Sequence, residues 1–197
     1  MSNNNLPVVS IVIVNYNGRR FLDTCFNSLL AVDYPQKQVE IIMVDNGSKD
    51  GSIQYMKDTF SSVKVVVNNQ NNYARANNLG IKNSSGKYVV FINNDITVER
   101  NWLIELVRCA EADPTIGVVG SKILFKNGLV QSLGLTHHVN FYWGDIGFHS
   151  RDCEDYVVKD EIVGLSGCSA KTNKKSIIGF GAIRNAKYIV IENPEIS

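Results

Sequence analysis

The sequence predicts an α/β protein with a doubly wound, mostly parallel sheet and a small hairpin addition. Three observations favour this class: short apolar runs rich in β-branched residues, amphipathic segments between them, and polar clusters where the runs end. The 197 residues fit one domain. Hydrophobic residues make up 44% and charged residues 20%, a globular composition that argues against disordered, collagen-like and coiled-coil chains.

Strands and helices are expected to alternate through the first half of the chain. Val8 to Val14 is a continuous apolar run, the pattern of a strand buried on both faces. Apolar residues then recur every three or four positions from Arg19 to Ala31, which is typical of one face of a helix. The same alternation predicts strands at 39–44, 63–67 and 87–92, and helices around 53–60, 74–82 and 102–110. Asp50 or Ser48 is expected to cap the helix that contains Ile53.

The pattern changes after Asp113-Pro114, because a proline disfavours a helical residue before it and is expected to end the last helix. Asn127-Gly128 separates two short apolar stretches and predicts a hairpin turn. The segment from His137 to Asp160 has little periodicity and is interpreted as a long loop.

Charge and cysteine content exclude several classes of protein. Twenty Lys and Arg against 19 Asp and Glu give a net charge of +1, which offers no general field for binding a nucleic acid. The four cysteines, Cys25, Cys109, Cys153 and Cys168, form no C-x-x-C pair and indicate buried thiols in a reducing compartment. The first residues lack the pattern of a signal peptide, and no apolar stretch reaches about 18 residues, so a cytoplasmic protein is expected.

Polar clusters follow four successive strands: Asn15-Tyr16-Asn17, Asp45-Asn46, Asn68-Asn69 and Asn93-Asn94-Asp95. Ligands of doubly wound sheets bind outside the carboxyl ends of the strands, so these clusters predict a binding crevice. Asn and Asp also occur often in turns, and for any single cluster that alternative stays open.

The glycine-rich phosphate motifs of dehydrogenases and P-loop NTPases do not occur in the sequence. A diphosphate bound at the predicted crevice would therefore need a metal ion to offset its charge. Mg²⁺ and Mn²⁺ prefer oxygen ligands and usually bind through one or two carboxylates plus the phosphates of the substrate. Asp95 follows an apolar strand directly and is placed for that role.

Several segments, in this order, carry a resemblance to a known family: SIVIVNYNG, VDNGSKDGS, YARANNLGI, YVVFINNDITVERNWL and IGVVGSKILFKNGLVQSLG. They resemble the family 2 glycosyltransferases with the Rossmann-like GT-A fold, in particular the branch with rhamnosyltransferases and other sugar transferases of cell-surface polysaccharide assembly. The similarity covers about residues 8–170. It implies one domain over 1–197, with a nucleotide-binding half at 8–95 and an incomplete acceptor-side half at 96–197.

The resemblance implies an enzyme that moves a sugar from a UDP- or dTDP-sugar to a polysaccharide or lipid-linked acceptor, with inversion and with Mg²⁺ or Mn²⁺. Asp45 matches the aspartate that hydrogen-bonds the base, and a carboxylate suits the N3–H of uracil or thymine. Asp95 matches the last residue of the metal-binding D-x-D motif. A single carboxylate there leaves the cation held mainly by the diphosphate. The donor-binding residues that the resemblance implies are Asn15, Tyr16, Asn17, Asp45, Arg75, Asn77 and Asn94.

The catalytic base of the family usually lies in a Glu-Asp pair, and this chain departs from that pattern. When residues 188–197 are aligned with the family segment, Glu192 falls on the glutamate and Asn193 on the base. An amide cannot accept the proton, so Glu192 becomes the candidate base. The alternatives are Glu195 and the loop residues Asp152, Glu154 and Asp155.

A second hypothesis is a nucleotide-sugar-binding module with weak or no transfer activity. A third, a nucleotidyltransferase, is disfavoured because the glycine-rich basic loop it needs near the first strand is absent. Association with the inner face of a membrane, with a partner protein or with a second copy of the chain is compatible with the sequence. No nucleic-acid partner is expected.

Overall fold

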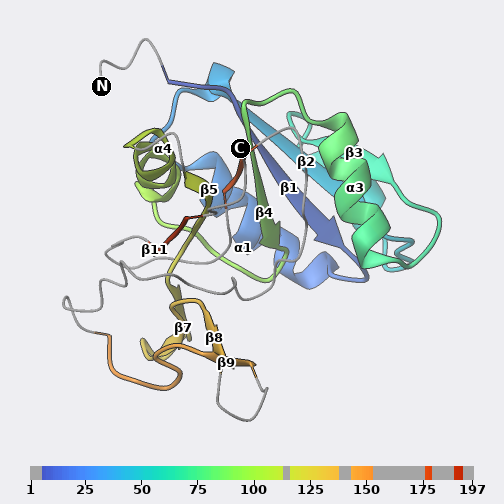
Figure 1. Cartoon of the computed structure of the whole chain (residues 1–197). Coiled ribbons are helices and arrows are strands. Elements are labelled where there is room, and N and C mark those ends of the chain that lie inside the picture. Colours follow the sequence, from blue (N-terminus) through green and yellow to red (C-terminus); the bar gives the residue numbers. More distant parts are fainter. Residues whose placement is uncertain (1–5, 113–115, 138–142, 153–175, 179–188, 193–197) are drawn as a thin grey trace.

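The computed structural model describes residues 6–112, 116–137, 143–152, 176–178 and 189–192. Seven strands form the main sheet in the order β11-β5-β10-β4-β1-β2-β3 (Figure 1). Strand β11 runs antiparallel to β5, and every other neighbouring pair in this sheet is parallel. The prediction of a mostly parallel α/β sheet is confirmed.

The first half of the chain alternates strand and helix, and each predicted strand and helix lies within two residues of its expected bounds, whereas the 3₁₀ turn at Gln36–Gln38 was not predicted. The elements are β1 (Val9–Asn15), α1 (Arg19–Leu30), the 3₁₀ turn η2 (Gln36–Gln38), β2 (Val39–Asp45), α2 (Ser52–Thr59), β3 (Lys64–Val67), α3 (Tyr73–Asn83), β4 (Tyr88–Asn93) and α4 (Trp102–Ala112). The predicted end of α4 at Asp113-Pro114 lies outside the described residues.

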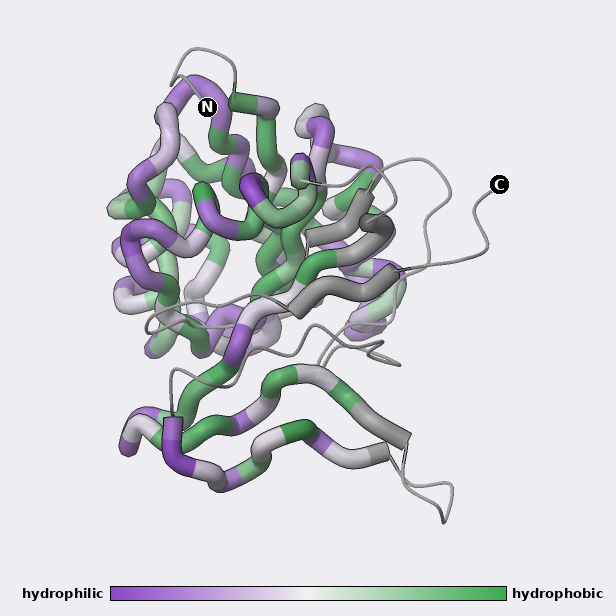
Figure 2. Tube along the Cα trace, turned by 60° about the vertical axis from the view of Figure 1, so that its left-hand side comes forward, coloured by the Kyte–Doolittle hydropathy of each residue, from purple (hydrophilic) through white to green (hydrophobic). Residues whose placement is uncertain are grey.

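Helices cover both faces of the sheet, as a doubly wound fold requires. Side chains alternate along β1, so Ile11 and Ile13 join the core under α1, α2 and α4. Val12 points to the opposite face, where it packs with Ala76 of α3. Gly80 lets α3 approach closely, because a Cβ at this position would collide with the Val12 side chain. Figure 2 shows the hydrophobic segments gathered along the strands in the interior.

The buried face of α1 follows from its sequence spacing. Four apolar residues of α1 follow one another at steps of three, one and three positions and are all buried in the core: Leu22, Cys25, Phe26 and Leu29. Burial raises the pKa of the Cys25 thiol to about 12, and the negative charge of Asp95 adds to the shift. Cys25 and Cys109 are therefore buried free thiols, as predicted, while Cys153 and Cys168 lie outside the described residues.

Residues 121–152, which we refer to as the hairpin segment, leave the main sheet after β5 (Ile116–Gly120). They form two antiparallel pairs, β6 (Ile123–Leu124) with β7 (Val130–Ser132) and β8 (Leu135–His137) with β9 (Trp143–Asp145). The predicted turn at Asn127-Gly128 is confirmed, because Gly128 has a φ of +83° and donates its N–H to the carbonyl of Phe125 at 2.9 Å.

The interpretation of His137 to Asp160 as one long loop was wrong for part of its length. Strand β9 lies within it, and Arg151 forms a β-bridge with Leu129. A strand of three residues is too short to show an alternating pattern.

Two further strands complete the sheet and were not predicted at these places. Strand β10 (Ser176–Ile178) inserts between β4 and β5, parallel to both. Strand β11 (Ile189–Glu192) pairs with the other edge of β5, with a register shift between Ile191 and Glu192. The strands β4 and β5 are therefore not neighbours, although they follow each other across one helix.

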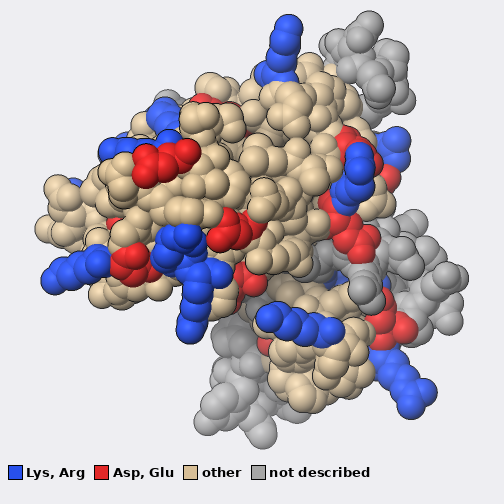
Figure 3. Space-filling view, turned by 180° about the vertical axis from the view of Figure 1, so that it is seen from behind, with Lys and Arg blue, Asp and Glu red and all other residues tan. Residues whose placement is uncertain are grey.

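Basic and acidic side chains are interspersed on the face shown in Figure 3, in keeping with the net charge of +1. Among the helices in the described part of the chain, none combines the length and apolar character needed to cross a membrane.

Candidate functional site

The polar clusters at the ends of β1, β2, β3 and β4 lie along one edge of the sheet. In the parallel register Asn15 is level with Asp45, Asp45 is level with Val67 just before Asn68, and Val14 is level with Asn93. The structure therefore brings together the segments that the sequence analysis selected. We refer to this edge as the rim.

Asp45 is fully buried and its carboxylate is held by three donors. Oδ1 accepts the backbone N–H of Gly47 at 3.1 Å and of Ser48 at 2.8 Å, and Oδ2 accepts Asn15 Nδ2 at 3.0 Å. Gly47 has a φ of +91°, which a glycine adopts without strain. A carboxylate oxygen can accept two hydrogen bonds, so Oδ2 keeps one position for a further donor.

Asn15 lies between Asp45 and the segment after β4. Its side chain is fully buried, and its Oδ1 accepts Asn94 Nδ2 at 2.7 Å. Its own Nδ2 donates to Asp45 and also to Ser48 Oγ at 3.1 Å. Asn15 and Asn94, both predicted to bind the donor, thus bond to each other within the protein.

Asn17 and Ser48 join the loop after β1 to the loop after β2. The backbone N–H of Asn17 donates to Ser48 Oγ at 2.9 Å, and Asn17 Oδ1 accepts the backbone N–H of Lys49 at 2.8 Å. Asn17 has a φ of +50°, a conformation that Asn tolerates better than most residues. Ser48 was predicted only as a possible helix cap and not as a residue of the site, although it lies in the segment VDNGSKDGS.

Two aromatic side chains at the rim are about half exposed. Tyr16, which was predicted, is 50% exposed, and Tyr73 at the start of α3, which was not, is 48% exposed. The hydroxyl of Tyr73 donates to Asn93 Oδ1 at 3.5 Å, the limit of a hydrogen bond. An aromatic ring with an open face can stack on a nucleobase.

The start of α3 presents a basic side chain. Asn72 caps the helix, because its Oδ1 accepts the backbone N–H of Arg75 at 2.9 Å. The exposed Arg75 guanidinium donates from Nη1 to Gln70 at 3.1 Å. Asn77 is half-buried and donates to the carbonyl of Tyr73 at 3.1 Å, within its own helix. Arg75 can therefore turn toward an anion, whereas Asn77 is engaged by the backbone.

A second group of amides lies where β3 ends. Asn68 is buried and donates from Nδ2 to Asn46 Oδ1 at 2.7 Å and to the carbonyl of Gln70 at 2.6 Å. Asn46 donates in turn to Asn71 Oδ1 at 2.9 Å. These bonds fix the loop that leads into α3.

Asp95, the predicted metal ligand, lies two residues past the end of β4 and is exposed, and Asn93, the last residue of β4, is exposed as well. In the described part of the chain no group of three or more His, Cys, Asp or Glu side chains could hold a metal ion. Asp95 offers one carboxylate, and Asn93 offers an amide oxygen. This donor set fits a Mg²⁺ or Mn²⁺ ion whose remaining ligands are phosphate oxygens and water.

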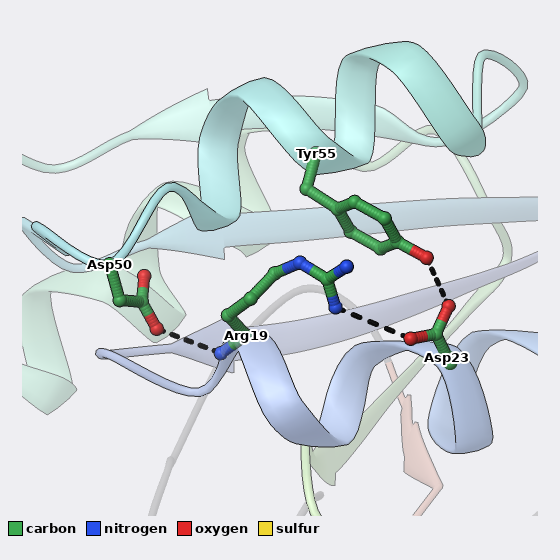
Figure 4. A network of polar contacts seen from close by, with 4 residues as sticks. All are labelled: Arg19, Asp23, Asp50 and Tyr55. Carbon is green, nitrogen blue, oxygen red and sulfur yellow. Dashed lines mark hydrogen bonds and ion pairs between the residues drawn. The ribbon is translucent and has the colours of Figure 1, made fainter.

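A polar network ties α1 to α2 beside the rim (Figure 4). Arg19 donates its backbone N–H to Asp50 at 2.8 Å, and its guanidinium lies over the Tyr55 ring and bonds Asp23 at 3.3 Å. Tyr55 donates its hydroxyl to Asp23. This bond and the Arg19 charge hold the pKa of Asp23 below its usual value.

The expected capping of α2 by Asp50 or Ser48 takes a different form. Gly51 is the N-cap and has no side chain to bond, while Asp50 accepts both the N–H and the hydroxyl of Ser52. Burial pushes the pKa of Asp50 up, but the hydrogen bonds from Ser52 and from the Arg19 backbone outweigh it and hold the pKa below its usual value. Asp50 thus joins the starts of two helices.

The candidates for the catalytic base lie mostly outside the described residues. Glu192 is the last residue of β11, and the structure describes its backbone only. Asp152 is described and forms an ion pair with Lys122. The predicted positions Asn193, Glu195, Glu154 and Asp155 fall outside the described ranges.

The chain belongs to the family described as Glycosyl transferase family 2, whose sequence model matches residues 10–176. It is 32% identical over 103 residues to Glycosyltransferase AglE of Haloferax volcanii, which covers 50% of this chain and 34% of that protein. It is 35% identical over 134 residues to the O-antigen biosynthesis protein RfbC of Myxococcus xanthus, covering 66% of this chain and 10% of that protein. The chain thus spans only 34% and 10% of the length of these two relatives.

Solved structures share the fold. Mannosyltransferase PcManGT from Pyrobaculum calidifontis, in complex with GDP-Man and Mn²⁺, matches with a TM-score of 0.55 and 23% identity over 62% of this chain and 37% of that one. Residues 1–349 of S. aureus TarS, in complex with UDP-GlcNAc, match with a TM-score of 0.57 and 21% identity over 64% and 38%. These likenesses confirm the predicted GT-A fold.

Proposed function

We propose that the rim binds the nucleoside diphosphate of a UDP- or dTDP-sugar and that the chain transfers the sugar to a saccharide or lipid-linked acceptor. The observation that carries this proposal is the placement of two carboxylates: Asp45 ends β2 and Asp95 follows β4, on either side of β1. Strands β2 and β4 are therefore two strand spacings apart, which is about 10 Å. The Asp45 carboxylate is buried, and Asp95 is exposed.

The proposed contact with the nucleobase is supported by Asp45 Oδ2, which accepts one hydrogen bond from Asn15 and can accept a second. This oxygen suits the N3–H of uracil or thymine, and the three protein donors fix the direction of the carboxylate. The half-exposed ring of Tyr16 is available to pack against the base or ribose.

The diphosphate end is supported by Asp95 and Arg75. Asp95 would hold a Mg²⁺ or Mn²⁺ ion, which when bound neutralises the charge that develops on the departing diphosphate. Arg75 keeps several guanidinium N–H groups beyond the one that bonds Gln70, and these can meet phosphate oxygens.

The second candidate function is a nucleotide-sugar-binding module without transfer, and one specific observation favours it. Asn193 stands where the family alignment expects the base, so Glu192 would have to take the proton of the acceptor hydroxyl. We further propose a cytoplasmic location, in keeping with the free thiols of Cys25 and Cys109.

Calorimetric titration with UDP and with dTDP in the presence of Mn²⁺ tests the proposed site. We expect binding that Asp95→Ala removes and that Asp58→Ala, a change at an exposed aspartate on α2, preserves. The proposal is overturned if neither nucleotide binds, or if Asp95→Ala binds as tightly as the wild-type chain. If the wild-type chain transfers sugar and Asp95→Ala does not, the second candidate function, a binding module without transfer, is excluded.

A further inference from the structure

The middle residue of Asn93-Asn94-Asp95 turns its amide into the protein. Asn94 is half-buried, and its Nδ2 lies 2.7 Å from Oδ1 of the fully buried Asn15. Asn93, one residue earlier, is exposed. The two neighbouring asparagines therefore face different surroundings and are not interchangeable.

The direction of each hydrogen bond in this group is dictated by Asp45. The Asp45 carboxylate accepts hydrogen bonds, so Asn15 presents its Nδ2 to Asp45, where it lies 3.0 Å from Oδ2. The same orientation turns Asn15 Oδ1 toward Asn94, which must then donate. A series of hydrogen bonds with a fixed donor and acceptor direction thus runs from Asp45 through Asn15 to Asn94.

Gly18 provides the room for this series of hydrogen bonds. A Cβ at Gly18 would collide with Asn94 Nδ2 and lie 2.5 Å from Asn15 Oδ1, which are the two atoms of their hydrogen bond. The φ of Gly18 is −105°, a value that any residue adopts, so space alone requires glycine here.

We propose that Asn94 is a positioning residue, which acts through Asn15 to hold Asp95 at a fixed place relative to Asp45. The proposal rests on the proposed function, in which Asp45 meets the base and Asp95 meets the cation. In this proposal Asn94 acts through its Nδ2, which donates to Asn15 Oδ1, and not as a ligand of the cation. It sets the spacing and direction of the two carboxylates before the donor binds.

Identical substitutions at neighbouring positions should therefore have opposite effects. Asn93→Asp adds a carboxylate on the exposed side beside Asp95 and should strengthen cation binding. Asn94→Asp adds the same charge, but it places a carboxylate against Asn15 Oδ1, which cannot donate. It should displace the Asp95 segment and weaken cation binding, and Gly18→Ala should do the same without a change in charge.

The first experiment measures free Mn²⁺ by electron paramagnetic resonance with the full chain and UDP. We expect affinity for Mn²⁺ to rise in Asn93→Asp and to fall about tenfold or more in both Asn94→Asp and Gly18→Ala, about the loss expected for a supporting partner of a metal ligand. Affinity in Asn94→Asp equal to or above that of the wild-type chain overturns the inference, because a ligating role would give that result.

The second experiment needs no ligand and therefore stands if the proposed function fails. In the double variant Asp45→Asn with Asn94→Asp, the new amide can donate to Asn15, and Asn15 can rotate and donate to the new carboxylate. The donor and acceptor direction of the whole series of hydrogen bonds is then reversed. We expect the melting temperature of the double variant to fall by less than the sum of the decreases in the two single variants. A decrease equal to that sum overturns the inference. Absence of UDP binding by the wild-type chain would refute the proposed function alone.

Discussion

Lys122 and Asp152 close the hairpin segment at its base. Lys122 Nζ lies 2.5 Å from Asp152 Oδ1, and the two side chains are 6% and 25% exposed. Lys122 follows the end of β5, whereas Asp152 follows the bridge between Arg151 and Leu129. The ion pair therefore links the first and last parts of the hairpin segment, which extends away from the main sheet.

Removing either partner of this pair should have unequal costs. Asp152→Ala leaves the buried ammonium of Lys122 without a counter-charge and should destabilise the chain by about 2 kcal/mol or more. Lys122→Met leaves a carboxylate that can turn to solvent and should cost less. Urea unfolding of both variants measures the difference, and a larger loss in Lys122→Met would contradict the burial argument.

Ser48 is predicted to hold the loop after β1 in place. Ser48→Ala removes the acceptor for Asn15 Nδ2 and for the backbone N–H of Asn17, so we expect a loss of about 1 kcal/mol in unfolding free energy. Under the proposed function, the affinity for UDP in Mn²⁺ should fall as well. Ser62→Ala, at an exposed serine, is the control, and equal behaviour of the two variants would refute the role of Ser48.

Glu40 should contribute stability that depends on pH. It accepts hydrogen bonds from Ser10 Oγ at 2.5 Å and from the Ser85 backbone at 2.9 Å, at the end of β1 opposite the rim. Burial pushes its pKa up, but these bonds and the Lys64 charge outweigh burial and hold the pKa below 4.5. A lowered pKa means that the contribution is full at neutral pH and is lost as pH falls through the folded-state value.

Glu40→Gln should accordingly lower the unfolding free energy by about 1 kcal/mol near neutral pH and by progressively less in acid. Urea unfolding of the variant and the wild-type chain at a series of pH values checks this. A difference that stays constant between neutral pH and the acid end would show that the charge of Glu40 contributes nothing.

Asp50 is predicted to stabilise two helices at once. Asp50→Ala removes the acceptor for the first N–H of α1 (Figure 4) and also for the N–H of Ser52 at the start of α2. We expect a loss of about 1 to 2 kcal/mol, the range of a capping interaction. Circular dichroism during thermal unfolding measures it, with Asp58→Ala as the matched aspartate on the exposed side of α2. A loss no larger than that of the control would argue against the joint role.

The sequence alone predicted the parts of the fold that have long repeating patterns. Two such segments are long enough to show their pattern. The apolar run from Val8 to Val14 indicates a buried strand, and the helical spacing is visible in Leu22, Cys25, Phe26 and Leu29. Strands β9 and β10 have three residues each, so their pairing depends on partners that no local pattern reveals.

The candidate site was predictable to the level of its clusters. Parallel topology forces Asp45 and Asn15 to the same edge, and the polar residues after the strands indicate it. The hydrogen bonds inside the rim were not predictable. The clearance at Gly18 and the acceptor role of Ser48 are properties of three-dimensional contact, since Gly18 is 76 residues from Asn94 in the chain.

The position of β10 has a consequence for synthesis on the ribosome. The strand that separates β4 from β5 begins only at Ser176, so a growing chain that already holds β1 to β4 presents the backbone edge of β4 without its neighbour. Such an edge can pair with another chain. We therefore expect the edge of β4 to stay unpaired until residues 176–178 have been made, so that closing this seam is a late event in the maturation of the protein.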